Sequence, residues 1–408
     1  MPDNVACGEL DLLRLKQALA LAEQGFGLTD PNPRVGCVIG HLDGRVLGQG
    51  HTQQAGGAHA EVMALRAAHT AGQPVQGATA WVTLEPCAHH GRTPPCCDAL
   101  IAAGIGRVVI AVPDPFPSVD GQGAARLRAA GIDVVELDKL AATLAATGTG
   151  VPTANTELTE LLSAAHDINI GFFSRIRRGR PWVRMKIAAT LDGRTALDDG
   201  QSQWITSPQA RIDGQRWRRR ASAVLTGIGT VLEDDPMLDV RLVPTALQPM
   251  CLVVDSRLQT PPTARLLSRL DRRVQIVAAQ GDADCQAALV AAGASVLLLP
   301  GAGGKVDLAA LMQELGRQEI NEVHVEAGHK LNGSLLQAGL VDELLVYLAP
   351  RLMGPGRGMA ALPALSNLSQ TLDFEFFECT QVGPDMRLRA RLMARLRATL
   401  RPNLQPQA

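Results

Sequence analysis

Two stretches, "HAEVMAL" (residues 59–65) and "LEPCAHHGRTPPCC" (residues 84–97), determine how this 408-residue chain is interpreted. They supply the imidazole of His59, the carboxylate of Glu61 and the thiols of Cys87 and Cys96. Catalytic zinc takes three protein ligands from such groups and leaves its fourth position to water. Two thiolates balance the charge of the dication, and zinc lowers the pKa of bound water to about 7. The residues therefore predict a catalytic zinc site held by His59, Cys87 and Cys96.

The spacing of these residues constrains where they lie on helices. Residues two apart do not share a face of a regular helix, so His59 and Glu61 can converge only in a first turn. Gly56 and Gly57 give the irregular entry that such a turn needs, and two prolines precede Cys96. A helix N-terminus favours thiolate over thiol. Both ligand groups are therefore expected at the N-termini of helices.

The order of the motif indicates the chemistry. His-x-Glu followed by Pro-Cys and a further Cys is the signature of zinc deaminases, in which the glutamate moves protons and is not a ligand. This assigns Glu61 as the catalytic acid–base residue. Cys97, next to Cys96, is an alternative ligand, and we favour Cys96 because it completes the motif. His89 and His90 are also nearby in the sequence, and we expect them to contact substrate or solvent rather than to bind the metal.

Composition narrows the class of protein. A chain of 408 residues needs two or three domains, and 46% hydrophobic residues suffice for their cores. The net charge of −1 argues against a general nucleic-acid or membrane surface. No secretory signal and no apolar run of 18 residues are present. Eight cysteines do not form a disulfide scaffold, so we expect a cytoplasmic protein with free thiols.

Alternation of helical and strand patterns predicts two α/β domains. Helix patterns such as "ELDLLRLKQALALAEQG" alternate with strand patterns such as "ATAWVTLEP" in the first third, as in a three-layer α/β domain. Strand patterns resume at "PWVRMKIAATLDG" after an Ala/Thr/Leu-rich stretch. The predicted organisation is a deaminase domain at 1–145, a connection at 146–171, a second domain at 172–390 and a polar tail at 391–408.

The first domain resembles the bifunctional pyrimidine deaminase/reductase family of riboflavin biosynthesis. The run "GRTPPC" after "LEPC" carries the resemblance, together with "TDPNPRVGCVIG" (29–40) and "HTQQAGGAHAEVMAL" (51–65). Eight residues separate Cys87 from Cys96, whereas cytidine and tRNA deaminases separate their two cysteines by two. The resemblance implies a cytidine-deaminase-like fold and a pyrimidine contact from Asn32, with His51, Ala58 and His90 in the same pocket. Phe116 stands where the family usually has Asn.

The second domain resembles the reductase half of the same family, through "RPWVRMKIAATLDGRTAL" (180–197), "TVLEDDPMLDVR" (230–241) and "VEAGHKLNGSLL" (325–336). That half has a dihydrofolate-reductase-like fold and uses NADPH. The resemblance implies cofactor contacts from Ala188, Trp204, Thr230, Asp234, Ser256, Gly328, His329, Lys330, Leu331, Asn332, Gly333 and Ser334. It implies substrate contacts from Ser202, Arg218, Leu238, Arg241 and Glu326. Lys186 and Asp192 are further pocket candidates, and Arg218 with Arg241 suits a phosphate clamp because guanidinium groups bind phosphate in a fork.

The resemblance implies two consecutive reactions on a small phosphorylated pyrimidine. The first is zinc-dependent deamination of 2,5-diamino-6-ribosylamino-4(3H)-pyrimidinone 5′-phosphate, and the second is NADPH-dependent reduction of its ribosyl group to ribityl. A homo-oligomer is also expected. Two alternatives remain open from the residues: a deaminase for another base joined to an unrelated reductase, and a non-catalytic zinc scaffold with a dinucleotide-sensing domain.

Overall fold

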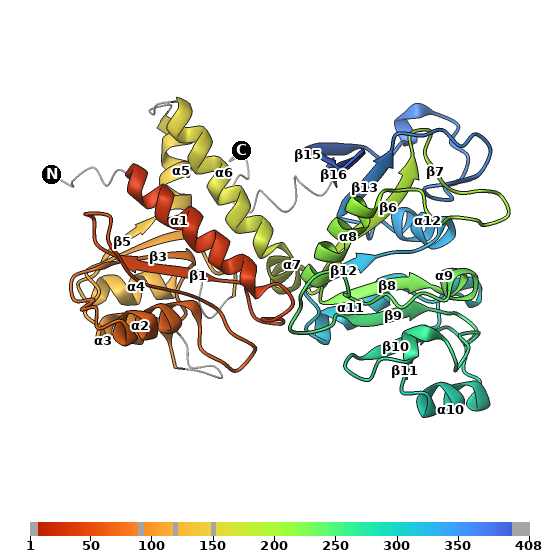
Figure 1. Cartoon of the computed structure of the whole chain (residues 1–408), viewed down its shortest axis with the longest axis horizontal. Helices are drawn as coiled ribbons and strands as arrows, with labels where there is room; N and C mark the ends of the chain where they lie inside the picture. The colour runs from red at the N-terminus through yellow and green to blue at the C-terminus, as the bar shows by residue number, and fades with distance from the viewer. Residues whose placement is uncertain (1–6, 89–93, 117–120, 148–151, 394–408) are drawn as a thin grey trace, which may run out of the picture. The chain divides into compact units, whose positions relative to one another are not determined.

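The chain forms two compact units, residues 1–178 and 179–408, and each is described by itself (Figure 1). The structure is a computed structural model that describes residues 7–88, 94–116, 121–147 and 152–393. Among the helices of these residues, none combines the length and the apolar character that crossing a membrane requires.

The first unit is built on a five-stranded sheet with the order β2-β1-β3-β4-β5. β1 is antiparallel to β2 and β3, whereas β3, β4 and β5 run parallel. The strands are β1 (Gly36–Gly40), β2 (Val46–His51), β3 (Thr79–Leu84), β4 (Arg107–Val112) and β5 (Asp133–Glu136). Every residue of the central strand β3 is buried, as expected for a strand covered on both faces.

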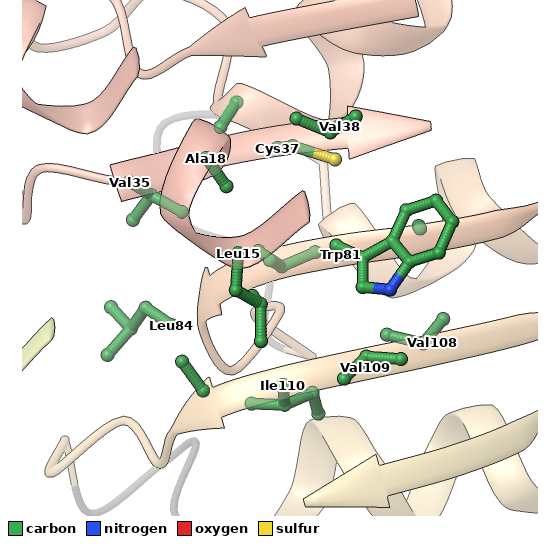
Figure 2. Packing of buried hydrophobic residues seen from close by; sticks show 14 of the residues in the cluster. Leu15, Ala18, Val35, Cys37, Val38, Trp81, Leu84, Val108, Val109 and Ile110 are labelled. Atoms are coloured by element: carbon green, nitrogen blue, oxygen red, sulfur yellow. The ribbon is translucent and has the colours of Figure 1, made fainter. Parts of the chain in front are cut away.

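Helices cover both faces of this sheet, so the first unit has the predicted three layers (Figure 1). Its helical elements are α1 (Glu9–Ala22), η1 (Glu23–Gly25), α2 (Ala60–Thr70), α3 (Cys96–Ala102), α4 (Gln122–Ala129), α5 (Leu137–Thr147), α6 (Pro152–Ile168) and α7 (Ile170–Arg178). In the core, Leu15 of α1 and Trp81 of β3 are completely buried, beside Val109 of β4 (Figure 2). This core fixes the ends of β3 and the starts of α2 and α3, where the predicted metal ligands lie.

The stretch 146–171, expected to connect the two domains, is instead largely helical and part of the first unit. Leu158, Leu161 and Ala165 of α6 are buried in the same core as α1 and β4. An Ala/Leu-rich stretch without strand periodicity can still bury one helical face, and this explains the difference.

The second unit is built on a nine-stranded sheet with the order β11-β10-β9-β8-β12-β6-β13-β16-β15. The seven strands from β11 to β13 run parallel, and β16 and β15 are added antiparallel. The strands are β6 (Trp182–Thr190), β8 (Ala223–Gly227), β9 (Met250–Val254), β10 (Val274–Ala278), β11 (Ser295–Leu298), β12 (Glu322–Val325), β13 (Glu343–Ala349), β15 (Phe374–Val382) and β16 (Asp385–Leu392). A separate two-stranded sheet pairs β7 (Arg194–Ala196) with β14 (Arg357–Gly358).

Helices flank the second sheet as well, which gives the predicted α/β architecture. They are α8 (Pro208–Arg220), α9 (Ile228–Asp234), η2 (Arg265–Leu267), α10 (Ala283–Ala291), η3 (Ala302–Gly304), α11 (Leu308–Arg317), α12 (His329–Gln337) and η4 (Leu368–Gln370). Ser207 caps α8 by accepting a hydrogen bond from the Ala210 amide at 3.2 Å, and Pro208 follows it. Strand β16 continues through residues 391 and 392, which the sequence assigned to the tail; residues 394–408 lie outside the described part.

A group of buried charges surrounds Trp217 on the α8 side of the second sheet. Four guanidinium groups lie 4.6–5.7 Å from the ring, and four carboxylates pair with them. We call it the Trp217 network; it comprises Arg184, Asp213, Trp217, Arg220, Glu322, Glu343, Glu378, Arg387 and Arg389. Its charges balance, which is the condition under which buried ions are tolerated.

Candidate metal centre and reductase pocket

Three of the predicted metal ligands converge at the ends of two helices in the first unit. His59 is the N-cap of α2, Cys96 is the first residue of α3, and Cys87 lies in the loop after β3. Nδ1 of His59 is 3.1 Å from Sγ of Cys96 and 3.7 Å from Sγ of Cys87. The potential ligand atoms all lie within 4.8 Å of one another. One imidazole and two sulfurs in this arrangement fit the ligand set of a catalytic zinc ion.

Glu61 lies in the first turn of α2, as the spacing predicted, and only 3% of it is exposed. Burial, followed by the negative charge of Cys87, raises the pKa of its carboxyl. A carboxyl in this environment can accept and return a proton more readily than one in water. Within the described residues, the group of metal-binding side chains contains His59, Cys87 and Cys96 and does not include Glu61.

Cys97 points away from the other two sulfurs. Its Sγ lies 3.3 Å from the carbonyl of Pro86 and 3.6 Å from that of Gly123, and burial raises its pKa to about 12. In contrast, Sγ of Cys96 lies 3.1 Å from Nδ1 of His59 and belongs to the group of potential ligand atoms with Cys87. The geometry therefore favours Cys96 over Cys97 as the second thiolate.

Glu85 holds the loop that carries Cys87. Its buried carboxylate accepts hydrogen bonds from the backbone amides of Ala124 at 3.0 Å, Gly121 at 3.1 Å and Asp114 at 3.4 Å. A Cβ atom on Gly123 would come within 2.1 Å of the carbonyl oxygen of Pro86. The loop that carries Cys87 thus depends on a close backbone approach between Gly123 and Pro86, which the ligand motif alone does not reveal.

The remaining deaminase predictions lie elsewhere in the first unit or outside the described residues. Asn32 follows the cis Asp30–Pro31 bond, and its amide donates to the carbonyl of Thr29 at 2.9 Å. His51 ends β2, and burial lowers its pKa. His89 and His90 fall outside the described residues. Phe116 is 39% exposed, and its amide donates to Oδ1 of Asp114 at 2.8 Å.

The second unit contains a cavity of about 720 Å³ near the carboxyl ends of β6, β8 and β12. This volume is typical of small-molecule pockets. Predicted cofactor residues that line it are Ala188, Trp204, Thr230, Asp234, Gly328, His329 and Asn332. All five predicted substrate residues line it too: Ser202, Arg218, Leu238, Arg241 and Glu326. Six basic and four acidic side chains line the cavity, and this surplus of two positive charges fits NADPH and a phosphorylated substrate.

Other predicted residues do not line this cavity. They are Ser256, Lys330, Leu331, Gly333 and Ser334. Gly333 has a packing role, because a Cβ there would lie 2.1 Å from the carbonyl oxygen of Ala361. Asp192 accepts hydrogen bonds from the amides of Met353 and Gly354 and so anchors a loop outside the cavity wall.

Glu326 is the centre of a buried cluster of charges in the cavity. Arg218 binds its carboxylate through Nε and Nη2, the latter at 2.9 Å, and donates from Nη1 to the carbonyl of Asp239. Lys186 and His324 lie 3.9 Å and 3.4 Å from the same carboxylate. Although burial opposes the effect, Arg218 holds the pKa of Glu326 well below its usual range. Burial lowers the pKa of Lys186.

Several wall residues were not identified from the sequence. Arg211 stacks on Trp204 with its guanidinium 4.5 Å from the ring, and Arg357 pairs with Glu233 at 2.9 Å. Arg265, from the short helix η2, lines the cavity as well. Each is a single basic residue without a motif, so only the tertiary structure shows that these residues meet at one pocket.

Comparisons with known proteins identify a deaminase region and a reductase region in the chain. The model for the cytidine and deoxycytidylate deaminase zinc-binding region matches residues 9–112, and the model for the RibD C-terminal domain matches residues 181–388. The riboflavin biosynthesis protein RibD of Escherichia coli is 46% identical over 92% of this chain and 97% of its own length. The same protein of Aquifex aeolicus is 38% identical over 93% of this chain and 97% of its own length.

Solved structures extend the similarity to the whole fold. RibD of Acinetobacter baumannii superposes with a TM-score of 0.79 at 38% identity, and covers 94% of this chain and 99% of its own. A diaminohydroxyphosphoribosylaminopyrimidine deaminase/5-amino-6-(5-phosphoribosylamino)uracil reductase of Thermotoga maritima gives the same TM-score and coverage at 30% identity. The chain therefore belongs to the RibD family of bifunctional riboflavin biosynthesis proteins, with a zinc-dependent deaminase unit followed by an NADPH-dependent reductase unit.

Proposed function

We propose that the first unit deaminates 2,5-diamino-6-ribosylamino-4(3H)-pyrimidinone 5′-phosphate. The convergence of His59, Cys87 and Cys96 beside the buried Glu61 is the observation that carries this proposal. These three residues would hold a zinc ion, which would supply an activated water as the nucleophile at neutral pH. Glu61 transfers two protons: it passes the first proton of the attacking water to the ring nitrogen as the C–O bond forms, and then the proton of the new hydroxyl group to the amine as the C–N bond breaks and ammonia leaves.

The second unit then reduces the ribosyl group of the deaminated product to ribityl. NADPH supplies the hydride, while the protein binds and orients both molecules. We propose that Ala188, Trp204, Thr230, Asp234 and residues 328–334, at the start of α12, contact the cofactor, together with Ser256, which follows β9. Glu326, which Arg218 orients, accepts hydrogen bonds from substrate hydroxyl groups, and Ser202, Leu238 and Arg241 complete the substrate site. Asn32 contacts the pyrimidine in the first unit.

Glu61→Gln separates the two activities. The variant keeps the shape of the side chain and loses the proton carrier, so ammonia release should fall by about 10²- to 10⁴-fold. Reduction of pre-deaminated substrate, followed by NADPH absorbance, should stay at the wild-type rate, and the zinc content should not change. Glu160→Gln, an exposed glutamate of the same unit, serves as the matched control. Equal loss of both activities in a folded Glu61→Gln protein would contradict independent sites.

We further propose a cytoplasmic homo-oligomer that acts on free small molecules and not on nucleic acid. All eight cysteines are free, as in a reducing compartment, and the net charge of −1 offers no general phosphate-backbone surface. Strand β15 ends the large sheet and exposes Phe376 and Phe377, with 63% and 41% exposure. Exposed apolar edges of this kind are suited to association. Light scattering on the purified protein measures the assembly, and a monomeric mass refutes this part.

A further inference from the structure

Arg265 is a cation of the reductase cavity that no part of the proposed function uses. It lines the cavity together with Leu238 and Arg241, and it is exposed. Within the described residues its guanidinium makes no hydrogen bond or ion pair, whereas its backbone is held in place. A free guanidinium at the wall of a ligand cavity is available to an anion.

The loop that carries Arg265 is well anchored. The backbone amide of Arg265 donates to Oδ1 of Asp235 at 2.8 Å, and the next two residues, Leu266 and Leu267, are buried. Arg272 ties this segment to the one that contains Leu238 and Arg241, by donating to the carbonyls of Leu266 at 3.0 Å and Leu238 at 2.8 Å. Because the backbone is already fixed, an anion that binds Arg265 has only one side chain left to order.

The other arginines of the cavity are already engaged by the protein. Arg218 directs all three of its nitrogens at Glu326 and the carbonyl of Asp239, and its side chain is only 13% exposed. Arg357 pairs with Glu233. Arg211 donates to the carbonyl of Thr206 at 3.0 Å and stacks on Trp204. These groups have fewer donors left for a ligand than Arg265 has.

Arg241 uses only Nη1, as Arg211 and Arg357 do, but unlike those two it is exposed. Nη1 binds Oδ1 of Asp239 at 2.7 Å, and the other carboxylate oxygen of Asp239 binds Arg269 at 3.0 Å. The side chain of Arg241 is 47% exposed, so Nε and Nη2 remain available. Asp239 therefore orients Arg241 without occupying it fully. Arg241 and Arg265 are the two least committed guanidinium groups in the cavity wall.

Building on the proposed function, we infer that Arg241 and Arg265 together bind the 5′-phosphate of the reductase substrate. A phosphate dianion has enough oxygens for two guanidinium forks, and two arginines match its charge. Arg218, which the sequence suggested as the partner of Arg241, instead orients Glu326 for the sugar. Arg241 follows Leu238 by three residues, and Arg272 joins the segment of Arg265 to the carbonyl of Leu238. The residues proposed for the cofactor at 328–334 instead follow β12 and begin α12.

Arg265→Ala tests this inference through the phosphate of the substrate. We expect KM for the phosphorylated substrate to rise about ten- to hundredfold, because a charge-assisted contact is lost, with kcat within about twofold. KM for the dephosphorylated substrate and for NADPH should not change. Inorganic phosphate should inhibit the wild type competitively against substrate, and this inhibition should weaken in the variant. Arg273→Ala, an exposed arginine outside the cavity, is the matched control.

Three results would overturn the inference. Equal rises in KM with and without the substrate phosphate would show a structural effect, and a rise in KM for NADPH would assign Arg265 to the cofactor. An Arg265→Ala enzyme that behaves as wild type in all assays would show that the residue is not used. Failure of the proposed function differs from failure of this inference, because the wild-type enzyme would then reduce neither the phosphorylated nor the dephosphorylated substrate.

Discussion

Replacement of Arg184 by Met is expected to destabilise the reductase unit strongly and leave the deaminase unit intact. The Arg184 side chain is 1% exposed and donates to Glu322 at 2.7 Å and to Glu343 at 2.9 and 3.2 Å. Its loss leaves the Trp217 network with one uncompensated negative charge. Breaking a buried ion pair by removing one partner typically costs about 3–5 kcal/mol.

The expected loss is large compared with the stability of a domain, about 5–15 kcal/mol. For a unit of this size each kcal/mol lowers the melting temperature by about 2–4 °C, so a fall of roughly 6–20 °C is expected. Differential scanning calorimetry can resolve the transitions of the two units. Only the reductase transition should shift, because the whole network lies within residues 179–408.

Two further variants make this prediction specific. Arg216→Met changes an arginine of α8 that is next to Trp217 in the sequence but 69% exposed, and it should cost less than about 0.5 kcal/mol. Glu343→Gln combined with Arg184→Met should cost less than the sum of the single changes, because the carboxylate that loses its partner is also neutralised. A loss below about 1 kcal/mol in Arg184→Met, or strict additivity in the double variant, would refute the reasoning about uncompensated buried charge.

Three other predictions concern the deaminase unit. Cys96→Ser should abolish zinc binding and ammonia release, whereas Cys97→Ser should retain both. Zinc bound by the Cys96→Ser protein but not by the Cys97→Ser protein would show that Cys97 is the ligand. Gly123→Ala should lower zinc occupancy and destabilise the unit by about 1–3 kcal/mol, measured by metal analysis and thermal unfolding, because its Cβ meets Pro86. Burial opposes the effect, but hydrogen bonds lower the pKa of Asp11 in the folded protein. The stability that the Asp11 carboxylate contributes is therefore fully present above the pKa it has in the unfolded chain, and it is lost as the pH falls through the pKa it has in the folded protein. The stability difference between wild type and Asp11→Asn should therefore be large at pH 7 and disappear in acid; a difference independent of pH would count against it.

The metal centre could be anticipated from the sequence because its chemistry is local. His59 and Glu61 are two residues apart, and the helix start that brings them together is written in the same few residues. The choice between Cys96 and Cys97 was less certain, because adjacent residues at a helix start point in different directions. The structure distinguishes them by the contacts of Cys97 with two backbone carbonyls.

The reductase cavity was harder to anticipate because its wall comes from many separate elements. Residues of the motifs around Ala188 and Glu326 could be carried over from the family pattern. Of the predicted residues in these motifs, Ala188, Glu326, Gly328, His329 and Asn332 line the cavity, whereas Lys330, Leu331, Gly333 and Ser334 do not. Arg211 and Arg265 belong to no motif, and a single arginine in a sequence usually indicates a solvated surface. Ser256 illustrates the opposite case: a motif residue that does not line the cavity in the described structure.

The two kinds of arginine in the reductase cavity suit two kinds of substrate group. The Arg218–Glu326 pair is buried, so it keeps a carboxylate charged and fixed where it can accept from neutral hydroxyl groups. Arg241 and Arg265 are exposed and lie where a charged phosphate can approach from solvent. Salt screens the attraction between exposed charges, almost completely beyond a Debye length of about 8 Å at physiological ionic strength, and affects buried pairs much less. Added salt should therefore raise KM for the phosphorylated substrate and leave kcat nearly constant, because capture depends on the exposed pair and orientation depends on the buried one.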